Sequence, residues 1–431
     1  MALLFLIPAL IFGVWDYRPH DVNNVECWVS DFAVICQQQG GSIAGLKWEK
    51  WTNHYYVFGA GIWFGTILAG GDTCVSVGYN PNSGYSEFVP GLVRQGTTAV
   101  NNPYVRVYIY PEDWPPDPDT FPMAPQGVRT DEDSWTCFNE NDSTYHVPGD
   151  KHPIGLEVYQ TGYADLDCMD AVFFKYEMKN CTTYTILNSY IGICMDHDIG
   201  EAGDDMYGLI LRQWFPQGSD SFYIDALPYG YDYDWQEVGW DSVGVVGVYM
   251  LETPDSVGPT TSMRFSLDID PSFDYQRYQV LKGINYQTGE SLGFMVGDTA
   301  PNDKRFLFAT GPFDLAPGEV KEFAFVIVLA YDTITIAYKA NEAKQLWEQQ
   351  IGIAEGSSRE VKDEKIATIT NGRLVIGRVD EVEIFDAMGR AVMRIRSPRS
   401  VIDLNRLSQG IYFAILKKGS GSQKVKILIV R

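Results

Sequence analysis

The chain has 431 residues, 45 % of them hydrophobic, and is long enough for two or three domains with cores of their own. Its formal net charge of −23 at pH 7 argues against nucleic acid and anionic lipid as partners, because both require cationic surfaces. The same charge favours solubility and hard cations. The 26 Tyr and 41 Gly residues suit an extracellular β protein, whose aromatic side chains pack on pleated sheets.

The first 13 residues are almost wholly apolar, but they are too few to span a bilayer. We expect residues 1–13 to be a signal peptide with cleavage near Gly13, although the basic residues that usually open such a peptide are missing. A buried N-terminal strand is the alternative. No other stretch is long and apolar enough for a membrane helix.

Seven cysteines lie before residue 195, and none forms a CxxC pair, which argues against a zinc ribbon. An oxidising compartment would allow up to three disulfides. Proximity in the sequence favours Cys27 with Cys36, and Cys181 with Cys168 or Cys194. Buried free thiols are the alternative, because Cys also packs well as a small apolar residue.

Short β-like segments occupy most of the first 270 residues. The run Ile154–Met195 alternates apolar and polar residues and predicts the centre of a large antiparallel sheet. Residues 111–150 are polar and rich in turn-forming residues, and we expect them to form an extended surface excursion. Other strands are expected at 22–36, 54–68, 105–110, 207–215, 221–226, 243–251 and 263–269.

Two helices are expected among these strands. Residues 332–350 carry the stronger helical spacing, and residues 272–282 predict a short helix. The segment 305–332 predicts a hairpin with its turn at 315–319. The region 20–351 is therefore expected to be an all-β, large antiparallel β-sandwich-like region with one helix near 332–350, either undivided or with a sub-domain boundary near residue 240.

The acidic stretch after the central strands is the clearest candidate for a site. Five carboxylates and two glycines occur within ten residues, and Ca²⁺ prefers 6–8 oxygen ligands. The spacing is not that of an EF-hand, and a solvated acidic loop is the alternative. Asp232 and Asp234 are candidates to complete the shell. The predicted metal ligands are Asp196, Asp198, Glu201, Asp204 and Asp205.

The common catalytic signatures are missing from the sequence: there is no HExxH, GxSxG, Walker loop or dinucleotide fingerprint. His197 lies between two carboxylates, which would favour its charged form. Aromatic groups at 48–51, 55–56 and 229–235 are candidates for stacking on sugars, although core packing is the commoner role for such residues.

The last 66 residues differ from the rest in charge. Residues 366–431 contain 12 Lys and Arg against 5 Asp and Glu, a balance of +7, which leaves 21 against 51, or −30, for the remainder. The polar segment 352–365 between them reads as a linker. Short strands separated by turn residues predict a small Ig-like β-sandwich after it.

The order "VEIFDAMGRAV … VIDLNRLSQGIYFAILKKGSGSQKVKILIV" resembles the type A C-terminal sorting domain of the type IX secretion system. One departure is that "ITNG" stands where this family usually has a Pro-Asn-Pro segment. The resemblance implies export through the outer membrane of a Gram-negative bacterium, removal of the tail, and release or attachment at the cell surface. An Ig-like module that stays attached is the alternative.

These observations lead to two hypotheses of function. The first is a secreted or surface-attached β protein with a structural, adhesive or binding role, stabilised by calcium, whose partners include the secretion machinery and either surface polysaccharide or further copies of itself. The second is a secreted hydrolase that acts on carbohydrate with paired carboxylates. A cleft that holds two carboxylates beside exposed Trp or Tyr would favour the hydrolase.

Overall fold

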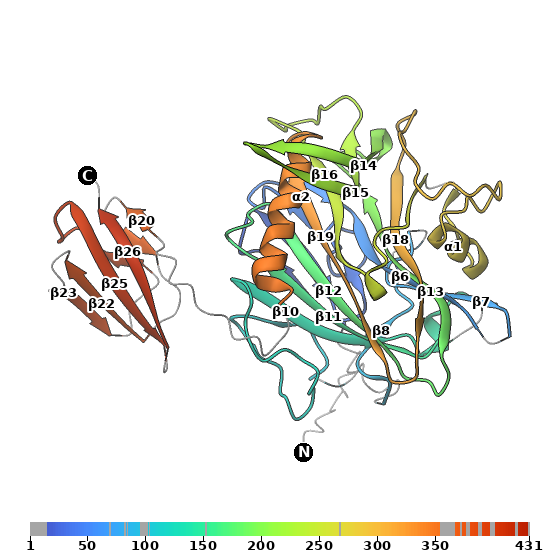
Figure 1. The fold of residues 1–431 in the computed structure, drawn as a ribbon, viewed down its shortest axis with the longest axis horizontal. Coiled ribbons are helices and arrows are strands. Elements are labelled where there is room, and N and C mark those ends of the chain that lie inside the picture. Colours follow the sequence, from blue (N-terminus) through green and yellow to red (C-terminus); the bar gives the residue numbers. More distant parts are fainter. Residues whose placement is uncertain are drawn as a thin grey trace, which may run out of the picture. The chain divides into compact units, whose positions relative to one another are not determined.

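The computed structural model describes residues 15–353 and 367–429, apart from gaps at 69, 82, 84, 95–101, 103, 151–152, 267–268, 371–372, 376–379, 387–389, 397–400 and 419–420. The chain forms two compact units, residues 1–353 and residues 354–431 (Figure 1). The predicted signal peptide at 1–13, and all but the first two residues of the predicted linker at 352–365, lie outside the described residues.

The first large sheet of the N-terminal unit has ten strands within the described residues, and all of its strand pairs are antiparallel. In hydrogen-bonded order they are β17 (Thr261–Ser266), β18 (Lys304–Leu315), β13 (Ile186–His197), β6 (Gly59–Ile67), β3 (Val34–Ile35), β2 (Val25–Ser30), β4 (Leu46–Trp48) and β5 (Tyr55–Val57), with β1 (Tyr17–His20) on β2 and β7 (Thr73–Val77) on β6.

The second large sheet has nine strands in the part of the chain that the structure describes, again with antiparallel pairing. In order they are β14 (Asp205–Gln217), β15 (Asp220–Asp232), β16 (Val245–Glu252), β19 (Val320–Ala330), β12 (Ala171–Asn180), β11 (Leu156–Ala164), β10 (Glu132–Asn139) and β8 (Val89–Pro90), with β9 (Tyr108–Ile109) on β10.

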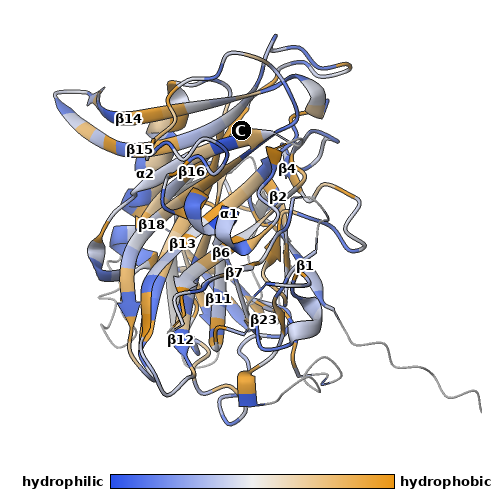
Figure 2. Ribbon diagram, turned by 90° about the vertical axis from the view of Figure 1, so that its right-hand side faces the viewer, coloured by the Kyte–Doolittle hydropathy of each residue, from blue (hydrophilic) through white to orange (hydrophobic). Residues whose placement is uncertain are grey.

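The two large sheets pack face to face around one core, and each is covered by a helix on its outer side (Figure 1). Successive residues of a strand point to opposite faces, so Phe174 contacts the core residue Phe325, whereas Phe173 stacks near Trp347 beside the outer helix. The strands therefore carry hydrophobic residues on both faces, while the connecting loops are mostly hydrophilic (Figure 2).

The helices match the sequence prediction. Helix α1 (Asp274–Leu281) covers the first sheet, and α2 (Thr335–Leu346), which a π-helical turn extends over Trp347–Ile351, covers the second. Short 3-10 turns occur at Ser143–Tyr145, Ala202–Asp204 and Pro254–Ser256. The all-β, two-sheet architecture is confirmed. Both large sheets combine strands from either side of residue 240, and a sub-domain boundary there stays a prediction.

The expectation that residues 111–150 form a surface excursion is wrong for residues 132–139, whereas the turn-rich segments on either side of them are mostly exposed or half-buried. Strand β10 lies within this segment, is buried along its whole length and pairs with β11 over eight residues. Several of its polar residues are paired inside the protein; for example, the Glu132 carboxylate accepts the backbone N–H of Asp21, and Ser134 Oγ lies 2.7 Å from His20 Nε2. Hydrogen bonding thus allows a polar strand to be buried.

The predicted hairpin at 305–332 is also wrong in its pairing. Strands β18 and β19 flank a turn at Ala316–Glu319, but β18 pairs with β13 and β17 in the first sheet, whereas β19 pairs with β12 and β16 in the second. The turn therefore carries the chain from one sheet to the other. A turn sequence alone does not distinguish this arch from a hairpin, because both reverse the chain direction.

The C-terminal unit forms a five-stranded and a two-stranded sheet within its described residues. Its small core includes Val382, Ile384, Leu404, Ala414 and Leu416. The five-stranded sheet is ordered β20 (Ala367–Thr370), β26 (Gly421–Ile429), β25 (Gly410–Lys418), β22 (Glu381–Asp386) and β23 (Ala391–Arg396), and β21 (Arg373–Val375) pairs with β24 (Val401–Asp403). Strand β20 is parallel to β26, and the other pairs are antiparallel.

Candidate functional site

The predicted metal ligands at the end of β13 form part of a cluster that contains an arginine. Carboxylate oxygens of Asp196, Asp198 and Asp303 lie within 4.8 Å of one another. Arg305 Nε is 3.2 Å from Asp196 Oδ1, and its Nη1 is 2.8 Å from Asp303 Oδ1. The Tyr79 hydroxyl donates to Asp196 Oδ2 at 2.6 Å. We call Asp196, Asp198, Asp303 and Arg305 the arginine-paired cluster.

Strand pairing explains why this cluster is neutralised. Arg305 on β18 stands directly opposite Asp196 on β13, so the ladder places opposite charges side by side. Burial still raises the pKa of Asp196 to about 6, against the lowering effect of Arg305. Burial, with repulsion from Asp196 and Asp303, raises the pKa of Asp198 to about 8.

A second cluster lies where β14 and β15 meet. Carboxylate oxygens of Asp204, Asp232 and Glu237 lie within 4.8 Å of one another. Within the described ranges, no Lys or Arg side chain forms an ion pair with any of these three carboxylates. Burial raises the pKa of all three carboxyl groups. We call these three residues the acid-only cluster.

The remaining predicted ligands lie around the acid-only cluster. Asp205 is fully buried and stands opposite Asp232 in the β14–β15 ladder, so two like charges face each other. Burial, together with repulsion from Asp198, raises the pKa of Asp205 well above its usual value. Glu201 contributes its backbone N–H, which donates to Glu237 Oε1 at 2.7 Å, and its carboxylate belongs to neither cluster.

One carboxylate oxygen of the acid-only cluster is buried and has no hydrogen-bond partner. Asp232 is 0 % exposed; its Oδ1 accepts the Gln236 N–H at 3.1 Å, whereas its Oδ2 has no partner within the described residues. Asp204 Oδ1 is likewise buried and unpaired. A buried charge without a partner costs several kcal/mol, on the order of 3–5, when nothing else compensates it. The arrangement therefore has the chemistry of an oxygen-rich cation site.

The chain turns tightly against this cluster at Gly200. Its φ of +68° lies in the left-handed region, and a Cβ atom there would stand 2.0 Å from the Glu237 carboxyl carbon. Glycine at this position therefore allows Glu237 to reach the loop. The sequence shows this glycine among the acids of the loop, but not its closeness to a carboxylate 37 residues further along.

The expectation that the flanking carboxylates keep His197 charged is wrong. The ring is fully buried, and its Nε2 lies 3.2 Å from the Met206 carbonyl oxygen, to which it donates. Burial lowers the pKa of His197 to about 4, so the imidazole is neutral at physiological pH despite its acidic neighbours. Adjacent residues in a strand point to opposite faces, which separates this ring from the Asp196 and Asp198 carboxylates.

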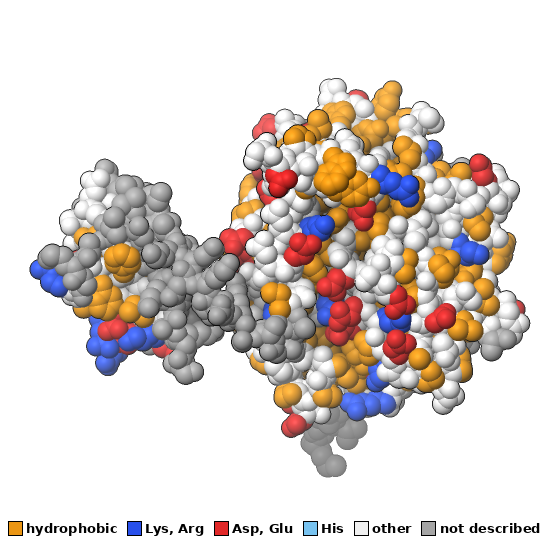
Figure 3. All heavy atoms as spheres, viewed as in Figure 1, with side chains coloured by type: hydrophobic (Ala, Val, Ile, Leu, Met, Phe, Trp, Pro, Cys, Tyr) orange, Lys and Arg blue, Asp and Glu red, His pale blue; other side chains and the backbone are white. Residues whose placement is uncertain are grey.

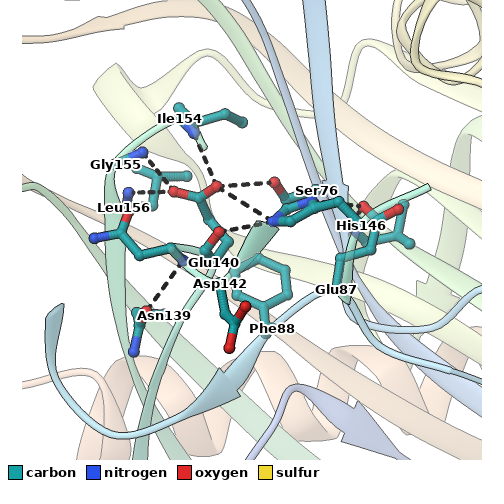
Figure 4. Close-up of polar contacts among 12 residues, drawn as sticks. Ser76, Glu87, Phe88, Asn139, Glu140, Asp142, His146, Ile154, Gly155 and Leu156 are labelled. Atoms are coloured by element: carbon teal, nitrogen blue, oxygen red, sulfur yellow. Dashed lines mark hydrogen bonds and ion pairs between the residues drawn. The ribbon is translucent and has the colours of Figure 1, made fainter. Parts of the chain in front are cut away.

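A third group of buried charges, which the sequence analysis missed, joins β10 to the helix α1. The Glu140 carboxylate accepts the backbone N–H groups of Ile154, Gly155 and Leu156, and the His146 ring donates from Nε2 to the Glu140 carbonyl at 2.7 Å (Figure 4). His146 Nδ1 lies 3.7 Å from a carboxylate oxygen of Glu87.

Glu87 connects this group to the helix. Its Oε1 accepts from Arg277 Nη1 at 3.1 Å, and both side chains are buried. Burial opposes protonation of His146, but the Glu87 carboxylate outweighs it and the pKa of His146 is raised. Burial, with repulsion from Asp150 and Glu87, raises the pKa of Asp274 to about 8. We call Glu87, Glu140, His146, Asp274 and Arg277 the helix-linked cluster; none of these residues lines any of the four pockets given for the described residues.

The aromatic groups named from the sequence divide between core and surface. Trp48 and Tyr56 are buried and pack edge to face at 5.6 Å. Trp51 and Tyr233 are exposed, by 64 % and 59 %. Neither lines a described pocket.

Among the cysteines, the structure brings one predicted pair together. The sulfur atoms of Cys27 and Cys36 lie 3.5 Å apart and both residues are fully buried, whereas Cys181 is exposed. All seven cysteines are thiols in the structure, and a disulfide between Cys27 and Cys36 stays a prediction.

Comparison with solved structures gives only distant similarity. A bacterial glucoamylase complexed with acarbose superposes with a TM-score of 0.41 at 8 % identity, over 77 % of this chain and 36 % of its own. A putative aldose 1-epimerase from Escherichia coli K12 gives 0.34 at 10 % identity, over 74 % and 100 %, and a polysaccharide lyase gives 0.33 at 8 %, over 93 % and 47 %. No curated protein matches the chain.

The C-terminal unit gives the informative match. Residues 364–431 match the family model described as the secretion system C-terminal sorting domain, which covers every described strand of that unit. No described helix of the chain is both long enough and apolar enough to cross a membrane. Residues 364–431 are therefore a type IX secretion C-terminal sorting domain, and the chain is exported and then either secreted or attached at the cell surface.

Proposed function

We propose that the exported N-terminal unit is a non-enzymatic protein with a structural, adhesive or binding role at the cell surface, and that Ca²⁺ stabilises it at the acid-only cluster. The observation that carries the calcium proposal is the buried, unpaired Oδ2 of Asp232 among three converging carboxylates. Ca²⁺ accepts 6–8 oxygen ligands in irregular geometry, and carboxylates of this kind are its usual protein ligands.

The proposed ligand set differs from the one expected from sequence. Asp204, Asp232 and Glu237 would bind the ion directly, and Asp205 would face it from across the ladder. The arginine-paired cluster is the weaker candidate, because Arg305 already supplies a positive charge there. Cation binding at the acid-only cluster would remove the like-charge repulsion between β14 and β15.

The arrangement of the pockets supports a binding role over hydrolysis. One pocket of about 540 Å³ contains the acids Glu252, Asp255 and Glu322, but no Trp or Tyr lines it. Another of about 530 Å³ is lined by Trp and Tyr residues but by no carboxylate. The two features that a carbohydrate hydrolase would combine thus lie in different pockets of the described residues.

The calcium proposal is tested by thermal unfolding of the full chain in CaCl₂ and in EGTA. Calcium at 100 times its Kd would stabilise the fold by about 2.7 kcal/mol. Asp232→Asn removes a ligand and also a buried charge. The variant should therefore be less stable than the wild type in CaCl₂, and at least as stable in EGTA.

The matched control is Asp119→Asn, which alters an exposed carboxylate outside the three clusters. It should leave both melting temperatures unchanged. Equal melting temperatures of the wild type in CaCl₂ and EGTA would refute the calcium proposal. It would not affect export, which rests on residues 364–431.

We also propose that processing removes residues 1–13 and that cleavage within 352–365 separates the sorting domain from the exported unit. Mass spectrometry of protein recovered from culture medium and from the cell envelope would identify both new termini. Recovery of intact chain with residues 366–431 still attached would contradict removal of the tail.

A further inference from the structure

A groove of about 530 Å³ opens on the N-terminal unit, far from the acid clusters in sequence. Its walls come from the start of β1, the turn after β2, the loop after β3, and the segments before β8 and β11. Its volume lies within the range of about 300–1,000 Å³ that is usual for small-molecule sites. We define the aromatic groove by Trp15, Tyr17, Phe32, Gln37, Tyr85 and Tyr145.

We infer that the aromatic groove binds a neutral saccharide chain. This inference gives a ligand class to the proposed binding role, and it does not depend on the proposed calcium site, which uses other residues. Three properties of the groove carry it: aromatic rings exposed at its rim, a buried hydrogen-bond donor without a partner, and a lining without charge.

The aromatic rings combine a packed base with an exposed rim. Trp15 packs edge to face on Phe32 at 4.7 Å and lies 5.5 Å from the Tyr145 ring. Tyr85 and Tyr145 are 77 % and 41 % exposed. Large aromatic side chains gain free energy when they are covered, and the apolar C–H face of a pyranose ring can cover them while its hydroxyl groups remain hydrated.

Gln37 supplies the second property. The residue is 1 % exposed and lines the groove, and its Nε2 donates no hydrogen bond within the described residues. Buried amide groups are normally paired, so such a donor needs an explanation. A saccharide hydroxyl or ring oxygen in the groove would accept this hydrogen bond and remove the cost of the unpaired group.

The lining of the groove contains no charged residue. All twelve lining residues are aromatic, amide, hydroxyl or glycine, although the chain as a whole carries a net charge of −23. Anionic polymers would need Lys or Arg there. A proline-rich peptide also docks on aromatic grooves, but it offers mainly carbonyl acceptors. Side chains that both donate and accept, such as Gln37 and Ser42, match hydroxyl groups better.

The helix-linked cluster holds two walls of the groove in place. Tyr85 lies two residues before Glu87, and Tyr145 immediately precedes His146. Since His146 and Glu87 face each other at 3.7 Å in the buried interior (Figure 4), the two rim tyrosines are anchored to the same group of charges. A preformed rim lowers the entropy cost of binding.

The test is isothermal titration calorimetry of the full chain with neutral hexasaccharides (cellohexaose, maltohexaose and mannohexaose), with hexagalacturonic acid, and with decaproline. We expect at least one neutral hexasaccharide to bind, and the anionic saccharide and decaproline not to bind. All titrations are performed in CaCl₂, so that a failure to bind bears on the groove and leaves the calcium proposal to its own unfolding experiment.

Variants then locate the site. Tyr85→Ala and Tyr145→Ala should each weaken binding by about tenfold, a loss typical of removing one stacked ring. Gln37→Met should weaken binding to a similar extent while leaving the melting temperature unchanged or higher, because it removes a buried unpaired donor. A purely structural role for Gln37 would instead lower the melting temperature.

The controls are Trp51→Ala and Trp214→Ala, which remove exposed aromatic rings outside the groove. Both should bind like the wild type. The inference is overturned if no neutral hexasaccharide binds, if the Tyr85→Ala/Tyr145→Ala double variant binds as well as the wild type, or if decaproline is the probe that binds.

Discussion

The arginine-paired cluster and the acid-only cluster each bring three carboxylates together, but their electrostatics are opposite. In the arginine-paired cluster, the strand ladder sets Arg305 opposite Asp196. At the acid-only cluster, the β14–β15 ladder sets Asp232 opposite another acid, Asp205, which lies beside the cluster. The register of strand pairs therefore decides whether a buried carboxylate faces a cationic side chain or a second carboxylate. Four predictions test this contrast, and they run from the removal of a buried ion-pair partner to the removal of an exposed one.

The largest effect is expected from Arg305→Ala. The substitution removes the guanidinium with which Asp196, Asp270 and Asp303 each form an ion pair, and loss of one partner of a buried pair costs about 3–5 kcal/mol. Urea unfolding at pH 8 measures the loss. The loss of unfolding free energy should be smaller at pH 5. The raised pKa values of Asp196 and Asp198 leave these acids partly or fully protonated there, so less negative charge lacks its counterion. Equal losses at both pH values would argue against a charge effect.

The stabilisation by calcium should depend on the acid-only cluster and not on the arginine-paired cluster. Glu237→Gln should lose most of the calcium-dependent stabilisation, which is about 2.7 kcal/mol for the wild type at 100 times Kd, whereas Asp303→Asn should retain it. Differential scanning calorimetry in CaCl₂ and in EGTA measures both responses. If Asp303→Asn abolishes the response and Glu237→Gln does not, the ion binds in the arginine-paired cluster instead.

In the helix-linked cluster, Arg277 forms an ion pair with Glu87. Burial and neighbouring acids raise the pKa of Asp274 by more than Arg277 lowers it. Asp274 has a pKa raised to about 8, well above its unfolded value near 3.8, so between about pH 4 and pH 8 the folded state holds a proton that the unfolded state has lost. Its contribution to stability must therefore fall as pH rises through this window.

Replacement of Asp274 by Asn removes this dependence. The difference in unfolding free energy between Asp274→Asn and the wild type should grow in favour of the variant by up to about 1.4 kcal/mol per pH unit across the window. Chemical denaturation at pH 5, 6, 7 and 8 gives the slope. The raised pKa of His146 produces a fall of the same sign, but it is present in both proteins and cancels. Parallel curves would contradict the prediction.

The smallest effect is expected on the surface, where cations and acids lie side by side and solvent screens them (Figure 3). Glu112, 67 % exposed, pairs with Arg18, which also reaches Asp113 at 3.1 Å. Glu112→Gln should change stability by less than about 0.5 kcal/mol. A loss above about 1 kcal/mol would show that burial is not what distinguishes the clusters from the surface pairs.

Much of the fold can be predicted from the spacing of apolar residues in the sequence. The elements that this spacing did not predict have physical explanations. The alternation at 171–180 predicts β12, and the spacing at 332–350 predicts α2. Strand β10 was missed because its sequence, EDSWTCFN, has polar residues that are buried through long-range partners such as His20. The crossing of β18 and β19 to different sheets was missed because local sequence does not identify a strand's neighbour.

In the candidate sites, too, local features could be predicted from the sequence, whereas contacts between distant segments could not. The acidic segment 196–205 can be recognised from the sequence, because five of its ten residues are acidic. Asp232, Glu237 and Asp303 are distant in sequence and come close to this segment only in the folded protein. Asp232 was considered as a candidate, whereas nothing in the sequence separates Glu237 from other surface acids. The aromatic groove combines five separate segments, and the significance of Gln37 appears only when its burial and missing partner are seen.

The strand order of the sorting domain determines which segment of the chain completes its larger sheet. Strand β26 lies inside its sheet, between β20, the first described strand of the unit, and β25. Without the segment Gly421–Ile429, β20 would lose its described partner, and β25 would keep β22 alone. The strand that joins the first described segment of the sorting domain to the rest of its sheet is therefore the last one described along the chain.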